Sequence, residues 1–354
     1  MASPRDPDLK ISTYVFIALA LMVPERVSGQ GLTPLLLDFG SPREQLWGVL
    51  AEQPKGGAAF AFSVADQLAL HPDRDSFPYL AGTGIFLAPV LKYDRNVNNG
   101  FNGDRIYIAG IPFEVDEETK AVAATTVGAA LSGGISFGVA RGTTLTFTGR
   151  SEYQRAVGET FEVTTDTAAV SLGYTSQSWN YLDAAYLVNN EKRELSAEKI
   201  KIGSLTVGRL FGTAGEDLHD LSLTAMRAWD QDVWQSRARI GWTGTLSRVG
   251  VFRLGLEKGE KIDGRLLPLT TIIGSYSNTL FGAPTTLSAV YSHKSGGKFF
   301  GEDRRDEIFR VAIERRVTRR VTLFTSYETT KSSIDSFDED GFDIGITITG
   351  FRLH

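Results

Sequence analysis

Cysteine is absent from the 354-residue sequence, methionine occurs three times and histidine four times. A chain without cysteine forms no disulfide and no thiolate zinc site, and it is not a lipoprotein anchored through an N-terminal cysteine. The histidines include no pair at i, i+4, the spacing that binds zinc on one face of a helix. The sequence therefore predicts no metal, no other cofactor and no catalytic residues.

Long apolar runs are also missing. After the N-terminus no segment approaches 18 uncharged apolar residues, which excludes a helical inner-membrane protein. The N-terminal run "ISTYVFIALALMV" is too short for a spanning helix but suits a secretory signal. We expect residues 1–29 to be a signal peptide, cleaved after Val27-Ser28-Gly29. A soluble N-terminal helix is the alternative, because Asp6 and Asp8 are unusual in the leading segment of a signal.

Charge and composition narrow the class further. The net charge of −5 is mild and argues against nucleic acid as a partner. The 37 glycines exceed the usual share, which fits a membrane barrel better than a soluble enzyme.

The C-terminal stretch "GFDIGITITGFRLH" shows the pattern that recurs along the chain. Phe342, Ile344 and Ile346 alternate with Asp343 and Gly345, so a strand here has one apolar face and one small, polar face. A second sheet would cover the apolar face in a soluble protein. In an outer membrane, lipid would cover it and the polar face would line an aqueous lumen.

The same alternation predicts fourteen strands. They lie at about 82–94, 121–132, 134–148, 162–176, 179–190, 198–210, 219–230, 234–246, 249–258, 269–279, 284–294, 305–316, 319–329 and 341–351. An even number of strands of this length is typical of a bacterial outer-membrane barrel. The predicted fold class is all-β, a transmembrane antiparallel β-barrel of about 14 strands over residues 81–354, with 16 as the other possible count.

The connections alternate in length, as short periplasmic turns and long outer loops do. Counting back from the C-terminus, we expect long loops at 331–340, 295–304 and 259–268, and short turns at 317–318, 280–283 and 247–248. This alternation is inverted once, where the expected periplasmic turn at 211–218 is longer than the expected outer loop at 231–233. Further toward the N-terminus it resumes, with a long loop at 149–161 and a short turn at Gly133.

Residues 30–80 differ from the barrel and predict a short periplasmic helical segment. Ser41, Pro42 and Glu44 match a capping box, and Phe60, Val64 and Leu68 follow helical spacing. Two helices are therefore expected between 41 and 71. The alternative is an additional strand over 57–70.

A soluble β-sandwich would alternate too. The signal, the aromatic residues near strand ends and the arginines on the inward face favour the membrane barrel. If the apolar positions face lipid, six charged residues project into the lumen: Arg237, Arg239, Arg253, Glu257, Arg310 and Glu314. Charged side chains are tolerated inside a lumen when they are paired or hydrated. These six residues either constrict the lumen or only stabilise its wall.

Enzymatic motifs are weak. "SGGKFFG" lacks the spacing of a phosphate-binding loop, "GGISFG" is explained by a tight turn entering a strand, and "DSFDEDG" does not match a calcium loop. A Ser–His–Asp arrangement needs proximity only in space, so a membrane-bound hydrolase stays an unlikely alternative.

Two stretches carry a family resemblance. The first, "LAPVLKYDRNVNNGFNGDRIYIAGIPFEVDEETKA", contains Asn96, Asn98 and Asn99, and the second, "YSHKSGGKFFGEDRRDEIFRVAIERRV", contains Arg304, Arg305 and Asp306. Both resemble the C-terminal barrel of the surface lipoprotein assembly modifier family. The closing stretch "TSYETTKSSIDSFDEDGFDIGITITGF" is also similar to that family, with Ser332-Ser333 where the family's pattern has Ser-Asn. Better-known members have an array of tetratricopeptide repeats before the barrel, and this chain has room for at most one helical pair at 41–71.

The resemblance implies a non-enzymatic outer-membrane barrel that assists the translocation or surface display of a lipoprotein or small secreted protein. A passive or substrate-selective pore is the alternative. The partners expected are outer-membrane lipid and lipopolysaccharide, the barrel-assembly machinery and the protein cargo.

Overall fold

The computed structural model describes residues 32–354 except 53–56, 109–110, 214–216, 231, 248, 319, 349–350 and 353–354. The predicted signal peptide and the expected mature start at Gln30 lie outside the described residues.

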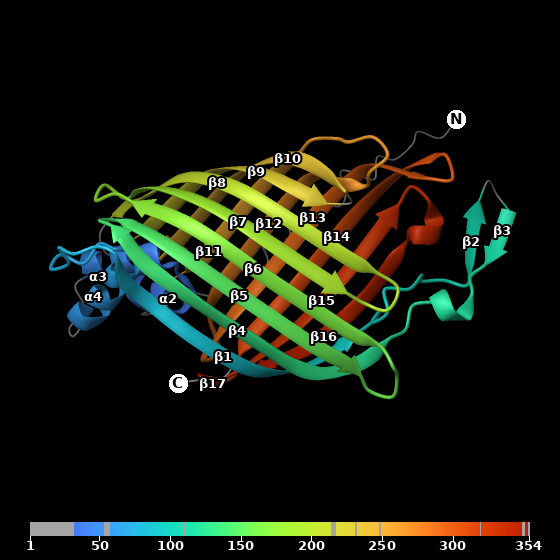
Figure 1. Ribbon diagram of the computed structural model, residues 1–354, viewed down its shortest axis with the longest axis horizontal. Coiled ribbons are helices and arrows are strands. Elements are labelled where there is room, and N and C mark those ends of the chain that lie inside the picture. Colours follow the sequence, from blue (N-terminus) through green and yellow to red (C-terminus); the bar gives the residue numbers. More distant parts are fainter. Residues whose placement is uncertain are drawn as a thin grey trace.

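The chain forms one closed antiparallel barrel of fourteen long strands (Figure 1). The strands are β1 Tyr79–Asp94, β4 Ala124–Ala140, β5 Thr143–Ala156, β6 Glu162–Thr175, β7 Asn180–Lys192, β8 Ala197–Thr213, β9 Asp217–Asp230, β10 Val233–Leu246, β11 Gly250–Gly259, β12 Leu267–Leu280, β13 Ala283–Phe299, β14 Glu302–Arg316, β15 Val321–Ser332 and β16 Glu339–Ile348. Neighbours in sequence pair with each other, and β16 pairs with β1. The short strand β17, Phe351–Arg352, also pairs with β1.

The two faces of the wall differ as the alternation predicted. Large apolar side chains are exposed on the outside, among them Leu87, Leu172, Leu223, Leu254 and Ile344. The residues between them face inward, and cross-strand pairs such as Arg239–Glu257 link inward positions. An apolar exterior around a polar interior is the arrangement of a transmembrane barrel, and this architecture belongs to the bacterial outer membrane.

Three turn predictions were wrong. The long loop expected at 149–161 is shorter, because β5 continues to Ala156 and only residues 157–161 connect it to β6. Gly133 lies inside β4, paired with Ile85 and Gly149, and the turn is at 141–142. No long loop occupies 295–304, because β13 and β14 continue to a two-residue turn at Phe300-Gly301. Both turn residues have positive φ, as a type I′ hairpin requires, so the Gly- and charge-rich composition marks an extended hairpin.

The remaining connections define the two ends. At one end the strands are joined by intervals of two to four residues, such as 141–142, 281–282 and 317–320. At the other end lie 95–123, 260–266 and 333–338. The first end is therefore periplasmic and the second extracellular. The interval predicted at 211–218 shortens to three residues because β8 and β9 extend into it, and it is still longer than the two residues between β9 and β10.

Three helices lie at the periplasmic end (Figure 1): α2 Leu32–Phe39, α3 Pro42–Glu52 and α4 Gly57–Gln67. The predicted capping box is present in α3, where Glu44 N–H donates to Ser41 Oγ at 3.3 Å and Ser41 N–H donates to Glu44 Oε2 at 2.6 Å. Helix α4 replaces the alternative strand over 57–70. Helix α2 was not predicted.

Among the described residues, no helix has the length and apolar character needed to cross a membrane.

The interval 95–123 contains structure of its own at the extracellular end. Strands β2 Arg105–Ile108 and β3 Ile111–Glu114 form a separate hairpin, which Figure 1 shows beyond the rim of the barrel. The short helix η1, Glu117–Thr119, follows it, and η2, Asp335–Phe337, lies between β15 and β16. Neither this hairpin nor the two short helices were predicted from the sequence.

The orientation predicts which positions a reagent can reach from outside the cell. Ser333→Cys and Lys261→Cys should react with a bulky maleimide on intact cells, because both follow extracellular strand ends. Thr318→Cys lies in the exposed periplasmic turn and should react only after lysis. The native chain has no cysteine, so it serves as the unlabelled control. If only position 318 were labelled on intact cells, the barrel would have the opposite orientation in the membrane.

Candidate functional site

Helix α2 lies inside the periplasmic end of the barrel. Its Leu36 is 1% exposed and packs against Tyr181, Leu210 and Leu218, which all occupy inward positions. Burial of such a side chain contributes about 1.5–3 kcal/mol. We call α2 and α3 together the helical plug.

Charged contacts anchor the helical plug to opposite parts of the wall. Arg43 on α3 donates to both carboxylate oxygens of Asp183, and its Nε–H donates to Thr175 Oγ1 at 2.8 Å. On α2, the Asp38 carboxylate pairs with Arg316 of β14. Arg253 of β11, one of the predicted lumenal arginines, donates to the carbonyl of Phe39. The plug thus contacts strands from β6 round to β14 across the periplasmic mouth.

A second charged cluster lines the lumen between β10 and β11. Glu257 is 5% exposed and accepts hydrogen bonds from Arg239 at 2.6 and 3.0 Å. Arg237 lies 3.5 Å from the same carboxylate and also donates to Gln235 Oε1 at 2.6 Å. One carboxylate serves two guanidinium groups, so the cluster carries one excess positive charge. The Arg239 side chain is 42% exposed, which leaves it accessible from the lumen.

The other predicted lumenal charges lie apart from this cluster. Arg310 is on the inward face of β14 and donates to Ser326 Oγ at 3.2 Å. Glu314 is exposed on the same face of β14. Arg150 of β5, which the sequence analysis did not name, pairs with Glu152 on the inward side of another part of the wall. The six predicted charges therefore share the lumen but do not form one site.

The family-motif asparagines hold the extracellular segment rather than a ligand. Asn98 is fully buried; its amide donates to Lys120 O at 2.7 Å and its Oδ1 accepts from Val122 N–H at 2.9 Å. Asn96 exchanges two hydrogen bonds with the backbone of Gly100. Asn99 donates to Ser196 Oγ at 2.9 Å, which connects the segment to the β7–β8 turn.

The segment also forms ion pairs on both sides of β1. Arg95 pairs with Glu328 and Glu339 of β15 and β16, while Arg193 next to β7 pairs with Asp94. Val97 is fully buried against Ala124, Ala156 and Val163. Beyond this core, hydrogen bonds to Asp104 and Glu117 raise the pKa of Lys120. These contacts attach the segment over the extracellular opening.

The second family motif braces the same rim. Arg304 pairs with Asp306 at 2.7 Å, and its guanidinium lies 3.6 Å from the ring centre of Phe337. Asp306 also accepts from Ser332 Oγ at 2.7 Å, and Ser333 Oγ accepts from the Arg305 N–H at 3.0 Å. Ser332-Ser333, the departure from the family pattern, thus connects β15 to β14. Arg305 itself is exposed on the outward face.

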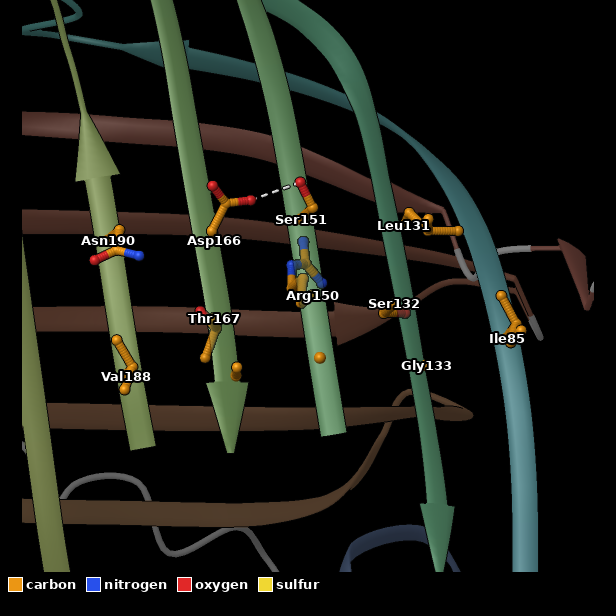
Figure 2. Close-up of a pocket in the computed structure, with 12 residues that line it drawn as sticks. Ile85, Leu131, Ser132, Gly133, Arg150, Ser151, Asp166, Thr167, Val188 and Asn190 are labelled. Carbon is orange, nitrogen blue, oxygen red and sulfur yellow. Dashed lines mark hydrogen bonds between the residues drawn. The ribbon is translucent and has the colours of Figure 1, made fainter. Parts of the chain in front are cut away.

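A groove of about 450 Å³ lies on the outer wall rather than in the lumen (Figure 2). Its apolar lining includes Ile85, Leu131 and Val188, which share the outward face of their strands. Ser151 donates to Asp166 at 2.7 Å along one side. Arg150 belongs to the opposite, inward face, so this groove faces lipid and is no part of a channel.

The hydrolase alternative finds no support in the described residues. His219 lies between the rings of Phe211 and Trp242, and no hydrogen bond reaches its buried Nδ1. His293 pairs with Glu307 in the strand register on the outward face. Within the described chain, no group of three or more acidic or histidine side chains could hold a metal ion.

The residues that sequence reasoning missed belong mostly to the helical plug. "LTPLLLDF" has a dense leucine content that could have indicated a buried helix. Asp183 and Tyr181 interrupt the pattern of small polar residues on the inward face. The sequence around them does not indicate that Arg43 contacts them. Trp179, one of the aromatic residues near strand ends, packs against the helices rather than lipid.

These features define an outer-membrane β-barrel whose lumen contains a helical plug and charged side chains. No family model matches the chain. No curated protein matches it.

Solved structures with a similar barrel include three bacterial proteins. OpdQ of Pseudomonas aeruginosa is 10% identical over 77% of this chain and 97% of its own, with a TM-score of 0.38. OprD of Pseudomonas aeruginosa is 10% identical over 81% and 98%, with a TM-score of 0.39. OccAB4 of Acinetobacter baumannii is 9% identical over 80% and 100%, with a TM-score of 0.39.

The buried asparagine gives a test of the extracellular segment. Asn98→Ala should expose Arg105 and Lys120 to trypsin, because it leaves a buried carbonyl and N–H without partners at a cost of about 1–3 kcal/mol. Limited proteolysis of the purified protein measures the effect. The exposed Asn99→Asp serves as the control and should be cleaved at the wild-type rate. Equal cleavage of all three proteins would show that Asn98 does not hold the segment.

Proposed function

We propose that the protein is a substrate-selective outer-membrane channel for small polar solutes, closed at rest by the helical plug. The observation that supports this most directly is the accessible Arg239 in a cluster with excess positive charge. A solute in the lumen meets that guanidinium, whereas Glu257 is covered by its two arginine partners. Small polar molecules suit a lumen lined by paired charges, because each can exchange hydrogen bonds with the wall.

Movement of protein cargo, which the family resemblance implies, has weaker support. A polypeptide would have to displace both the helical plug and the extracellular segment, which are held by separate sets of ion pairs. A small solute requires displacement of the plug alone or of part of it. We therefore retain lipoprotein display as the second hypothesis and small-solute passage as the first.

The lumenal cluster predicts charge selectivity. Arg239→Gln removes the excess positive charge while Arg237 continues to neutralise Glu257, so the channel should become more selective for cations. The reversal potential across a planar bilayer under a salt gradient measures this change. Arg239→Lys keeps the charge and should keep the wild-type value. An unchanged reversal potential in Arg239→Gln would place Arg239 outside the permeation path.

The helical plug predicts a change in gating. Arg43→Ala combined with Arg316→Ala removes its anchors to β7 and β14, and a loss of only about 1.4 kcal/mol changes the ratio of open to closed channels about tenfold. Single-channel recordings should show more frequent openings. Arg74→Ala, which breaks an exposed pair with Asp66 outside the barrel, is the matched control.

Two results would contradict the channel proposal. The first is a double variant that conducts no better than wild type while retaining the folded barrel. The second is a deletion strain that loses protease-accessible lipoproteins while the purified protein shows no conductance, which would favour lipoprotein display.

A further inference from the structure

Five basic residues gather on the outer surface of β7, β8, β9 and β11. They form what we call the cationic patch: Lys192, Lys199, Lys201, Arg227 and Lys258. None of them was singled out from the sequence, because they are far apart in the chain. The strand register brings them together.

The patch faces away from the lumen. Lys199 and Lys201 occupy the same alternate positions of β8 as Leu205 and Val207, which are exposed on the outer wall. Arg227 shares the face of Leu223 in β9, Lys258 that of Leu256 in β11, and Lys192 that of Tyr186 in β7. The inward arginines belong to the opposite set of positions.

The register makes the patch continuous. Lys201 is paired with Trp229 and Arg227 with Ser236, while Lys258 is paired with Ala238, two residues from Ser236. Lys201 and Arg227 thus occupy diagonal positions on the neighbouring strands β8 and β9, close enough for their long side chains to contact one phosphate, and Lys258 lies one strand further along, across β10.

The patch lies at the extracellular edge of the apolar band. Lys201 is four residues beyond Leu205 toward the extracellular end of β8, Arg227 is four beyond Leu223, and Lys258 is two beyond Leu256. A strand advances about 3.3 Å per residue, so these cations stand roughly 5–10 Å above the last aliphatic side chains when strand tilt is included. That is the level of lipid headgroups in the outer leaflet.

Within the described residues, none of the five cations pairs with a carboxylate, whereas Arg43, Arg239 and Arg304 do. Lys201 Nζ lies 4.5 Å from the ring centre of Trp229, Arg227 donates to Ser236 Oγ at 3.1 Å, and Lys258 donates to Thr270 Oγ1 at 2.7 Å.

Three outward carboxylates near the patch have other partners. On the outward face of the neighbouring strand β6, Glu162 accepts from Tyr153 and Asp166 accepts from Ser151. Glu260, beyond Lys258, accepts from the Ser236 N–H. Several positive charges are thus available for an anion at the level of the headgroups.

We propose that the cationic patch binds the phosphate groups of a phosphorylated glycolipid of the outer leaflet. Phosphate oxygens form strong charge-assisted hydrogen bonds with lysine and arginine, and each basic residue near an anionic leaflet adds to the attraction. Trp229 and Trp234 on the same outward face suit the interface between headgroups and acyl chains. The inference depends on the membrane orientation and not on the channel function.

The test compares retention of the diphosphorylated lipid A glycolipid in phosphatidylcholine nanodiscs. Native mass spectrometry would count the glycolipid bound to wild type, to Lys199→Gln/Lys201→Gln and to the same variant with Arg227→Gln and Lys258→Gln. We expect binding to weaken at least about tenfold in the double variant and further in the quadruple variant. Unchanged retention in the quadruple variant would overturn the proposal.

Controls separate phosphate recognition from other effects. Lys298→Gln/Lys331→Gln removes the same charge as the double variant on β13 and β15, away from the patch, and should bind like wild type. The glycolipid with its phosphates removed should bind weakly to every variant; binding equal to that of the phosphorylated form would also overturn the proposal. Heat-modifiable migration in gels confirms that each variant forms a barrel, and bilayer conductance shows independently whether the channel proposal holds.

Discussion

Closure of the sheet by β16 and β1 is the constraint on which the rest of the structure depends. In hydrocarbon each unpaired backbone group costs several kcal/mol, so the first and last strands must satisfy each other. The register from Val90–Thr347 to Tyr93–Ile344 does so, and β17 adds two residue pairs to β1. Once the ring is closed, each strand residue faces either lipid or lumen, and a slip of one residue would exchange the two faces. The assignment of every charged side chain follows from this register.

Because the barrel wall is closed, the segments outside the strands lie at its two mouths. The residues before β1 return into the periplasmic mouth as the helical plug, and those after β1 cover the extracellular mouth. Both are attached by side chains on inward positions, through Asp183 and Arg253 at one end and through Glu328 and Asp94 at the other. Such contacts are worth a few kcal/mol, far less than a ladder of strand hydrogen bonds. The mouths can therefore rearrange while the wall stays intact.

The wall was predictable from sequence because its period is local. Phe342, Ile344 and Ile346 reveal their face without knowledge of any partner strand, and the same holds for Arg239 and Glu257. The limits of β13 and β14 were not predictable from composition, because a Gly-rich, charged stretch is equally suited to a loop and to a hairpin beyond the membrane. The helical plug was missed for a different reason. Arg43 and Asp183 are 140 residues apart, and only the closed barrel brings them together.

Arginine and lysine side chains have different partners on the lumenal face and on the outer face of the wall. In the confined lumen Arg237 and Arg239 share Glu257, because an uncompensated charge with little solvent around it is costly. On the outer rim Lys199 and Arg227 need no protein carboxylate, because water and lipid headgroups surround them. The same residue types thus share a carboxylate in the lumen and provide unpaired positive charge on the outer surface. Net charge alone, mildly negative for the whole chain, conceals this division. The functional chemistry of the barrel is determined by the face on which each charge lies, and therefore by the register that closure imposes.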